Sequence, residues 1–270
     1  MNPNKVLWEK GDFSQIAASM RESGEALVAD LGVTEGMDVL DLGCGDGTTA
    51  LPAARLGADV LGVDIASNLV EAARRRAEAE SLDNLRVQEG DAASLDDLAD
   101  DSFDLTITMF GAMFASRPFD VAREMVRVTR PGGRIVMGNW IANDPTLVAQ
   151  ILRISSAYSP PPPEGFVSPM TWGVEPDVVE RFAAADVRPE SISFLRDTYW
   201  FNFPRPAAEV VGDFRRYYGP TMNAFDAAEA DGRADELESE LVSLFEAKNE
   251  TPGDATTTIP ATFLRVTVAV

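Results

Sequence analysis

Short apolar runs alternate with amphipathic segments between residues 38 and 140. The apolar runs predict strands at 38–43, 58–64, 85–91, 103–110 and 134–140. The segments between them have apolar residues at helical spacing and predict helices at 48–57, 66–82 and 118–130. Ser67 is placed to cap the second helix, and "PGG" at 131–133 to turn the chain into the fifth strand. This alternation predicts a parallel, doubly wound α/β sheet.

The chain outside this region follows a different pattern. Residues 12–32 predict one helix, because apolar side chains recur at helical spacing at Ile16, Met20, Leu27 and Leu31. After residue 140 we expect a proline-rich loop, a helix at 175–187, strands at 191–203 and 262–270, and acidic helices over 206–250 broken at Gly212, Gly219 and Gly232. We expect one domain over 1–270, with a core of 34–140, 190–204 and 262–270 and a small helical cap of 141–175 and 206–250.

The composition excludes several classes of function. A net charge of −21 argues against nucleic-acid partners, because such binding depends on neutralising phosphates. The acid excess is typical of salt-adapted proteins, but a GC-rich genome explains the scarcity of lysine equally well. With no histidine and one cysteine, we expect no internal disulfide, no metal site and no imidazole base. No apolar run is long enough to span a membrane and no signal-peptide core is present, so we expect a cytoplasmic protein.

The stretch "VLDLGCGDG" (39–47) places a glycine-rich loop directly after the first strand. Asp64 ends the second strand, and an acid at that point can accept the hydroxyls of a ribose in the crevice outside the sheet. The loop has the spacing G-x-G-x-G, whereas a dinucleotide needs G-x-G-x-x-G. Asp41 is an awkward neighbour for a pyrophosphate and suits a cationic ligand better. These features favour S-adenosylmethionine, which carries a sulfonium, an ammonium and a ribose but no phosphate.

With these motifs the chain resembles the class I S-adenosylmethionine-dependent methyltransferases, and its N-terminus resembles that of the small-molecule ubiquinone/menaquinone type. The matching stretches are "VLDLGCGDG" (39–47), "LGVDIA" (61–66), "VQEGDAASL" (87–95), "FDLTITMF" (103–110) and "EMVRVTRPGGRIVM" (124–137). The resemblance implies a Rossmann-like sheet of seven strands with an antiparallel last strand. It also implies that Asp41, Gly43 and Gly45 approach the methionine part of the cofactor. We expect Cys44, a small residue in the tight loop between two glycines, to line the site as an inert thiol.

The same resemblance assigns the nucleoside part of the cofactor. Asp64 would hold the ribose, and Ile65 would flank the adenine. Asp91 would meet the adenine amino group and Ala92 its ring, although a simple turn-forming Asp-Ala is an open alternative.

Two further segments are expected at the cofactor. The loop after the fourth strand, at Met109 and Phe110, would close over the methionine end. The N-terminal stretch "LWEKGDFSQIA" contains Trp8 and Phe13, which we interpret either as a lid over the cofactor or as part of a helix packed on the sheet.

The methyl acceptor has no signature in the sequence. We expect a small molecule under the cap, next to a cluster of side chains that is equally consistent with the cap's own core: Asn139, Trp140, Phe166, Met170, Trp172, Tyr217, Tyr218 and Met222. No catalytic residue is assigned, although possible bases are Asp144, Glu164, Asp197, Tyr199, Tyr217 and Tyr218. The alternatives to a methyltransferase are a nucleotide-dependent oxidoreductase and a protein that binds S-adenosylmethionine without turnover. The oligomeric state is left open.

Overall fold

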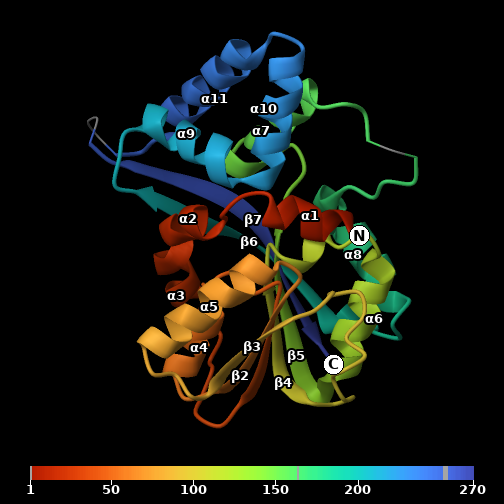
Figure 1. Cartoon of the computed structure of the whole chain (residues 1–270). Helices are drawn as coiled ribbons and strands as arrows, with labels where there is room; N and C mark the ends of the chain where they lie inside the picture. The colour runs from red at the N-terminus through yellow and green to blue at the C-terminus, as the bar shows by residue number, and fades with distance from the viewer. Residues whose placement is uncertain (1, 163, 252–254) are drawn as a thin grey trace.

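A sheet of seven strands forms the centre of the molecule (Figure 1). The computed structural model describes residues 2–162, 164–251 and 255–270. The strands lie in the order β3-β2-β1-β4-β5-β7-β6. Their bounds are β1 Asp38–Leu42, β2 Asp59–Asp64, β3 Leu85–Glu89, β4 Phe103–Met109, β5 Thr129–Trp140, β6 Ile192–Phe203 and β7 Thr257–Ala269. Strands β1 to β5 pair in parallel and β7 is antiparallel to both of its neighbours, which confirms the predicted sheet.

Helices cover both faces of this sheet (Figure 1). One layer contains α3 (Arg21–Asp30), α4 (Ala50–Arg55) and α5 (Ser67–Ala79), and the other contains α6 (Pro118–Val128) and α8 (Glu175–Ala183). Consecutive residues of β1 point to opposite faces of the sheet. Val39 packs with the α3–α5 layer, and Leu40 belongs to the core that includes α6. Strands buried on both faces are expected to be almost continuously apolar, which is the pattern that the sequence shows. No helix within the described ranges is long and apolar enough to cross a bilayer.

A group of helices lies beyond the carboxyl ends of the central strands, at the top of Figure 1. It consists of α7 (Leu147–Tyr158), α9 (Ala207–Tyr217), α10 (Gly219–Ala230) and α11 (Ala234–Lys248). Gly219 and Gly232 lie at helix ends, but the predicted break at Gly212 is wrong because this residue lies inside α9. Packing compensates for the low helix propensity of glycine there, since Phe214 contacts Phe245 of α11 at a centroid distance of 5.1 Å.

The helix predicted over 12–32 is divided into shorter pieces. The N-terminal region contains α1 (Pro3–Glu9), α2 (Ser14–Ala17), η1 (Ala18–Met20) and α3. Ser19 Oγ donates a hydrogen bond of 2.7 Å to the carbonyl of Ile16, and such local bonds compete with regular helical pairing. The apolar positions of the prediction are nevertheless buried, because the pieces follow one another along the same surface.

Two strand boundaries also differ from the prediction. The "PGG" stretch belongs to β5, which begins at Thr129, because Gly132 N donates to the carbonyl of Val270 (2.8 Å) and Val270 N to that of Gly133 (3.1 Å). The predicted turn is therefore wrong. Strand β7 begins at Thr257, five residues earlier than expected, because it pairs with β6 along the whole length of that long strand.

Candidate active site

The glycine loop after β1 has the backbone that its composition predicts. Gly43, Gly45 and Gly47 have φ values of +71°, +56° and +85°, a region that side chains disfavour. A Cβ on Gly43 would lie 2.7 Å from the Cα of Gly111, so this glycine is needed for the loop after β4 to approach. A Cβ on Gly45 would meet nothing within 4 Å, so the open side of the loop is at Gly45.

Asp64 at the end of β2 fixes the loop. Its Oδ2 accepts from Gly45 N (2.8 Å) and its Oδ1 from Ala66 N (2.9 Å). Burial raises the pKa of this carboxyl, and the backbone hydrogen bonds oppose that shift. A carboxylate has about four lone-pair positions, so each oxygen keeps capacity for one more donor, such as a ribose hydroxyl.

Asp41 and Asp46 are both buried but have different surroundings. Asp41 Oδ2 accepts from Thr49 Oγ1 (2.6 Å), while its Oδ1 has no partner among the described residues. Burial raises the pKa of Asp41 to about 7. Asp46 forms ion pairs with Arg21 (2.9 Å) and Arg76 (3.2 Å), which tie the loop to α3 and α5. The sequence could not predict these two ion pairs, because Arg21 and Arg76 lie 25 and 30 residues from Asp46 in the chain.

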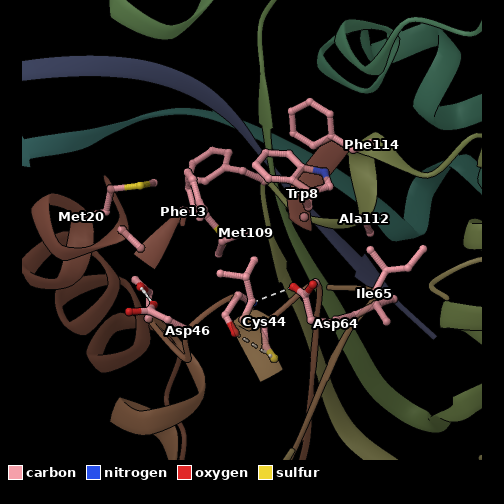
Figure 2. A pocket seen from close by; sticks show the side chains of 18 of the residues that line it. Trp8, Phe13, Met20, Cys44, Asp46, Asp64, Ile65, Met109, Ala112 and Phe114 are labelled. Atoms are coloured by element: carbon pink, nitrogen blue, oxygen red, sulfur yellow. Dashed lines mark hydrogen bonds between the residues drawn. The ribbon is translucent and has the colours of Figure 1, made fainter. Parts of the chain in front are cut away.

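A cavity opens at the carboxyl ends of β1, β2 and β4 (Figure 2). The residues predicted at the cofactor that line it are Trp8, Phe13, Gly43, Cys44, Gly45, Asp64, Ile65, Asp91, Ala92, Met109 and Phe110. Asp41 does not line the cavity, whereas its hydrogen-bond partner Thr49 does. Burial raises the pKa of the Cys44 thiol, which keeps it protonated and unreactive.

Phe110 directly follows β4 and lines the cavity. It is a non-glycine residue with a φ of +62°, which turns the chain sharply out of β4. Its ring stacks on Trp140 at the end of β5, with a centroid distance of 3.7 Å and an interplanar angle of 5°. This pair holds Met109 and Phe110 next to the glycine loop.

Helix α1 lies across the cavity and contains no fully buried residue. Asn2 caps the helix, and its side-chain amide donates to Asp91 Oδ2 (3.0 Å). Glu9 accepts from the backbone N (3.0 Å) and hydroxyl (2.7 Å) of Ser67. The prediction that Ser67 caps α5 is therefore wrong, because the carboxylate that caps this helix comes from α1. Figure 2 shows Trp8, Phe13 and Phe114 on the side of the cavity opposite Asp46 and Asp64.

The acceptor candidates divide into two groups. Trp140, Tyr199 and Tyr218 line the cavity. The others do not line it: Asn139, Asp144, Glu164, Phe166, Met170, Trp172, Asp197, Tyr217 and Met222. Side chains that the sequence did not single out complete the lining toward the cap, among them Val148, Ile151, Phe201 and Phe214. Their spacing could not distinguish them from ordinary core residues. Within the described ranges, no cluster of acidic or cysteine side chains is arranged to hold a metal ion.

Residues 40–137, which carry the glycine loop and Asp64, match the methyltransferase domain family. A protein of Mycobacterium tuberculosis that is itself uncharacterised is 32% identical over 250 residues, which cover 89% of this chain and 88% of that protein. The chain belongs to the S-adenosylmethionine-dependent methyltransferases. It is an enzyme of this family, and its cofactor is S-adenosylmethionine.

Two further similarities place this methyltransferase among known proteins. The crystal structure of the YcgJ protein of Bacillus subtilis shares its fold, with a TM-score of 0.58 and 19% identity over 91% of this chain and 97% of that one. The demethylmenaquinone methyltransferase of Renibacterium salmoninarum is 36% identical over 115 residues, which cover 42% of this chain and 46% of that enzyme.

Proposed function

We propose that this methyltransferase transfers its methyl group to a small-molecule acceptor held between the sheet and the cap. The observation that carries the proposal is one continuous cavity, which joins the glycine loop and Asp64 to Phe214 and Tyr218 of the cap region. Ligands of α/β sheets bind outside the carboxyl ends of the strands, which is where the polar end of this cavity lies. Helix α1 covers that end, so the reacting groups are shielded from bulk water.

The cofactor is proposed to lie with its adenosine along Asp64, Ile65, Asp91 and Ala92. Its methionine part would extend over the open side of Gly45 toward Thr49. Asp41 would act behind Thr49 as the negative charge that favours the ammonium group. Asp91 would exchange its contact with the Asn2 amide for the adenine amino group, which is a donor of the same kind.

The proposed reaction is an in-line displacement. The electron pair of the acceptor atom forms a bond to the methyl carbon as the carbon–sulfur bond breaks, and the sulfonium becomes a neutral thioether. Tyr199 and Tyr218 are not bases here, because burial raises the pKa of both phenols. We therefore assign no general base: an acceptor atom that carries a proton keeps it during the displacement, and the methylated product loses it to solvent when it leaves the site. The chain provides alignment and exclusion of water, which this chemistry chiefly needs.

We further propose that core and cap act as one domain, in the cytoplasm, where proteins seldom depend on disulfides.

The test is a transfer assay with a panel of thiols, amines, phenols and quinols, in which S-adenosylhomocysteine is measured as the product. The proposal predicts that at least one small molecule of the panel stimulates product formation, and that S-adenosylmethionine binds in calorimetry while NAD does not. Binding without any turnover across the panel would instead indicate a protein that only binds the cofactor. Tight NAD binding without heat from either adenosyl compound would refute the proposal altogether.

A further inference from the structure

Part of the same cavity is lined by apolar and aromatic side chains. We call this part the acceptor compartment and define it by Ile16, Met20, Trp140, Val148, Ile151, Phe201, Phe214 and Tyr218. These side chains come from the N-terminal region, β5, β6, α7 and α9, and from the residue that follows α9. All of them lie outside residues 40–137, the part of the chain that matches the methyltransferase domain family.

The charged groups that line the cavity are confined to its polar end. Among the described lining residues they are the carboxylates of Asp46, Asp64 and Asp91, and none is a lysine or arginine. Asp46 is already neutralised by its two arginines. An acceptor with a phosphate or carboxylate would therefore enter the compartment without a cation to pair with. Burying an unpaired charge is costly, so the lining selects against such molecules.

Tyr218 supplies a hydrogen-bond donor to this compartment. Its ring is fully enclosed, with centroids 5.5 Å from Phe214 and 6.0 Å from both Trp8 and Phe13. Within the described residues its hydroxyl makes no hydrogen bond, and its oxygen is not among the fully enclosed unpaired polar atoms, so it is open to the cavity that Tyr218 lines. Burial raises the pKa of the phenol, which keeps the proton available for donation.

Tyr199 lines the same cavity but its hydroxyl belongs to the other end. A Cβ on Gly24 would lie 3.0 Å from the Tyr199 hydroxyl and 2.7 Å from the carbonyl of Thr48. The Tyr199 hydroxyl therefore lies beside the glycine loop. This leaves Tyr218 as the lining tyrosine whose hydroxyl could donate a hydrogen bond to the acceptor.

We infer that the acceptor compartment binds an uncharged, apolar, ring-bearing molecule, and that the Tyr218 hydroxyl orients it by donating to an oxygen of the ring system. The inference rests on the proposed function, since it names the class of acceptor for the same cavity. It assigns Tyr218 a positioning role and no part in moving the acceptor's proton.

Four two-ring probes test the inference by calorimetry on the full chain. 2-Naphthamide and 2-naphthoate have the same shape but differ in charge, and 2-naphthol and naphthalene differ by one hydroxyl. Each probe is titrated into protein saturated with S-adenosylhomocysteine and into protein without it. We expect 2-naphthamide to bind at least about tenfold more tightly than 2-naphthoate. We also expect 2-naphthol to bind more tightly than naphthalene.

Substitution of the two adjacent tyrosines then isolates the hydroxyl. Tyr218→Phe should weaken 2-naphthol roughly 2- to 10-fold, the range for one neutral hydrogen bond, and leave naphthalene unchanged. Tyr217→Phe is the matched control, because Tyr217 does not line the cavity, and it should change neither probe. Because Tyr218→Phe leaves the ring in place, its thermal transition should stay close to that of the wild type.

Equal binding of the charged and neutral probes would overturn the apolar class of acceptor. An unchanged preference for 2-naphthol in Tyr218→Phe would overturn the role of Tyr218. Failure of S-adenosylhomocysteine to bind would count against the proposed function instead. The titrations without cofactor would still decide the chemistry of the compartment in that case.

Discussion

At the scale of single residues, Asp64 links the cofactor's expected position to the architecture of the loop. Asp64→Ala should weaken binding of S-adenosylhomocysteine by about 1.5–3 kcal/mol, the scale for lost hydrogen bonds to a charged group. Asp59→Ala is the matched control, because Asp59 begins the same strand but is exposed at its far end. Calorimetry should show normal binding for the control. Normal binding by the Asp64 variant would refute the assignment of the ribose.

Asp41 gives the site a dependence on pH. Its pKa of about 7 in the cofactor-free protein lies above the ordinary value of 3.8, so the folded protein holds a proton that the unfolded chain loses first. Folding stability contributed by this group therefore falls as the pH rises from about 4 to 7. An ammonium nearby favours the carboxylate, so affinity for S-adenosylhomocysteine should rise with pH up to about 7, by at most about tenfold per pH unit.

Calorimetry between about pH 5.5 and 7.5 measures this dependence. In Asp41→Asn the rise in affinity should be largely absent, since the amide does not titrate. A variant that keeps the full pH dependence would show that another group is responsible, and Asp64 is the first to examine because burial raises its pKa as well.

At the scale of elements, α1 has the contacts of a lid. It is held by Asn2, Asn4 and Glu9 through polar contacts with Asp91, the carbonyl of Phe114 and Ser67. Deleting residues 1–14 should leave the thermal transition of the cofactor-free protein nearly unchanged, because α1 contributes no fully buried residue. The deletion should remove most of the stabilisation that S-adenosylmethionine gives, and most of the transfer activity.

A pair of point variants separates the lid from a packing role. Trp8→Ala should reduce cofactor-dependent stabilisation, whereas Val6→Ala should not, because Val6 is 48% exposed on the same helix. A cofactor-free deletion protein that unfolds at a much lower temperature would show instead that α1 is part of the folded core. Full activity after the deletion would leave α1 without a role at the site.

Some elements could be predicted from neighbouring residues in the sequence, and others depend on residues far away in the chain. Strands β1 to β4 and the glycine loop could be predicted, because apolar runs, glycines and strand-end acids are patterns of neighbouring residues. The 3-10 turn at 18–20 coincides with a side-chain hydrogen bond from Ser19, and the carboxylate that caps α5 belongs to Glu9, 58 residues before Ser67. Tyr217 and Tyr218 are adjacent residues of one type, so only the packing of α9 and α10 decides that Tyr218 lines the cavity.

At the scale of the whole molecule, the cavity has a polar end built by the sheet and an apolar end built with the cap. The N-terminal segment connects the two parts. Asn2 bonds to Asp91 after β3, and Lys10 lies 2.5 Å from both Asn223 and Asp226 of α10. Cofactor and acceptor would therefore both lie beneath the N-terminal segment, so that one movement of this segment would close both parts of the cavity.

Whether this cavity holds the cofactor can be seen in a crystal structure of the chain with S-adenosylhomocysteine. We predict the ribose hydroxyls within hydrogen-bond distance of Asp64, the adenine between Ile65 and Ala92, and the sulfur facing the acceptor compartment near Phe110. S-adenosylhomocysteine bound at another place, or a cavity that stays empty at saturating ligand, would show that this cavity is not the cofactor site.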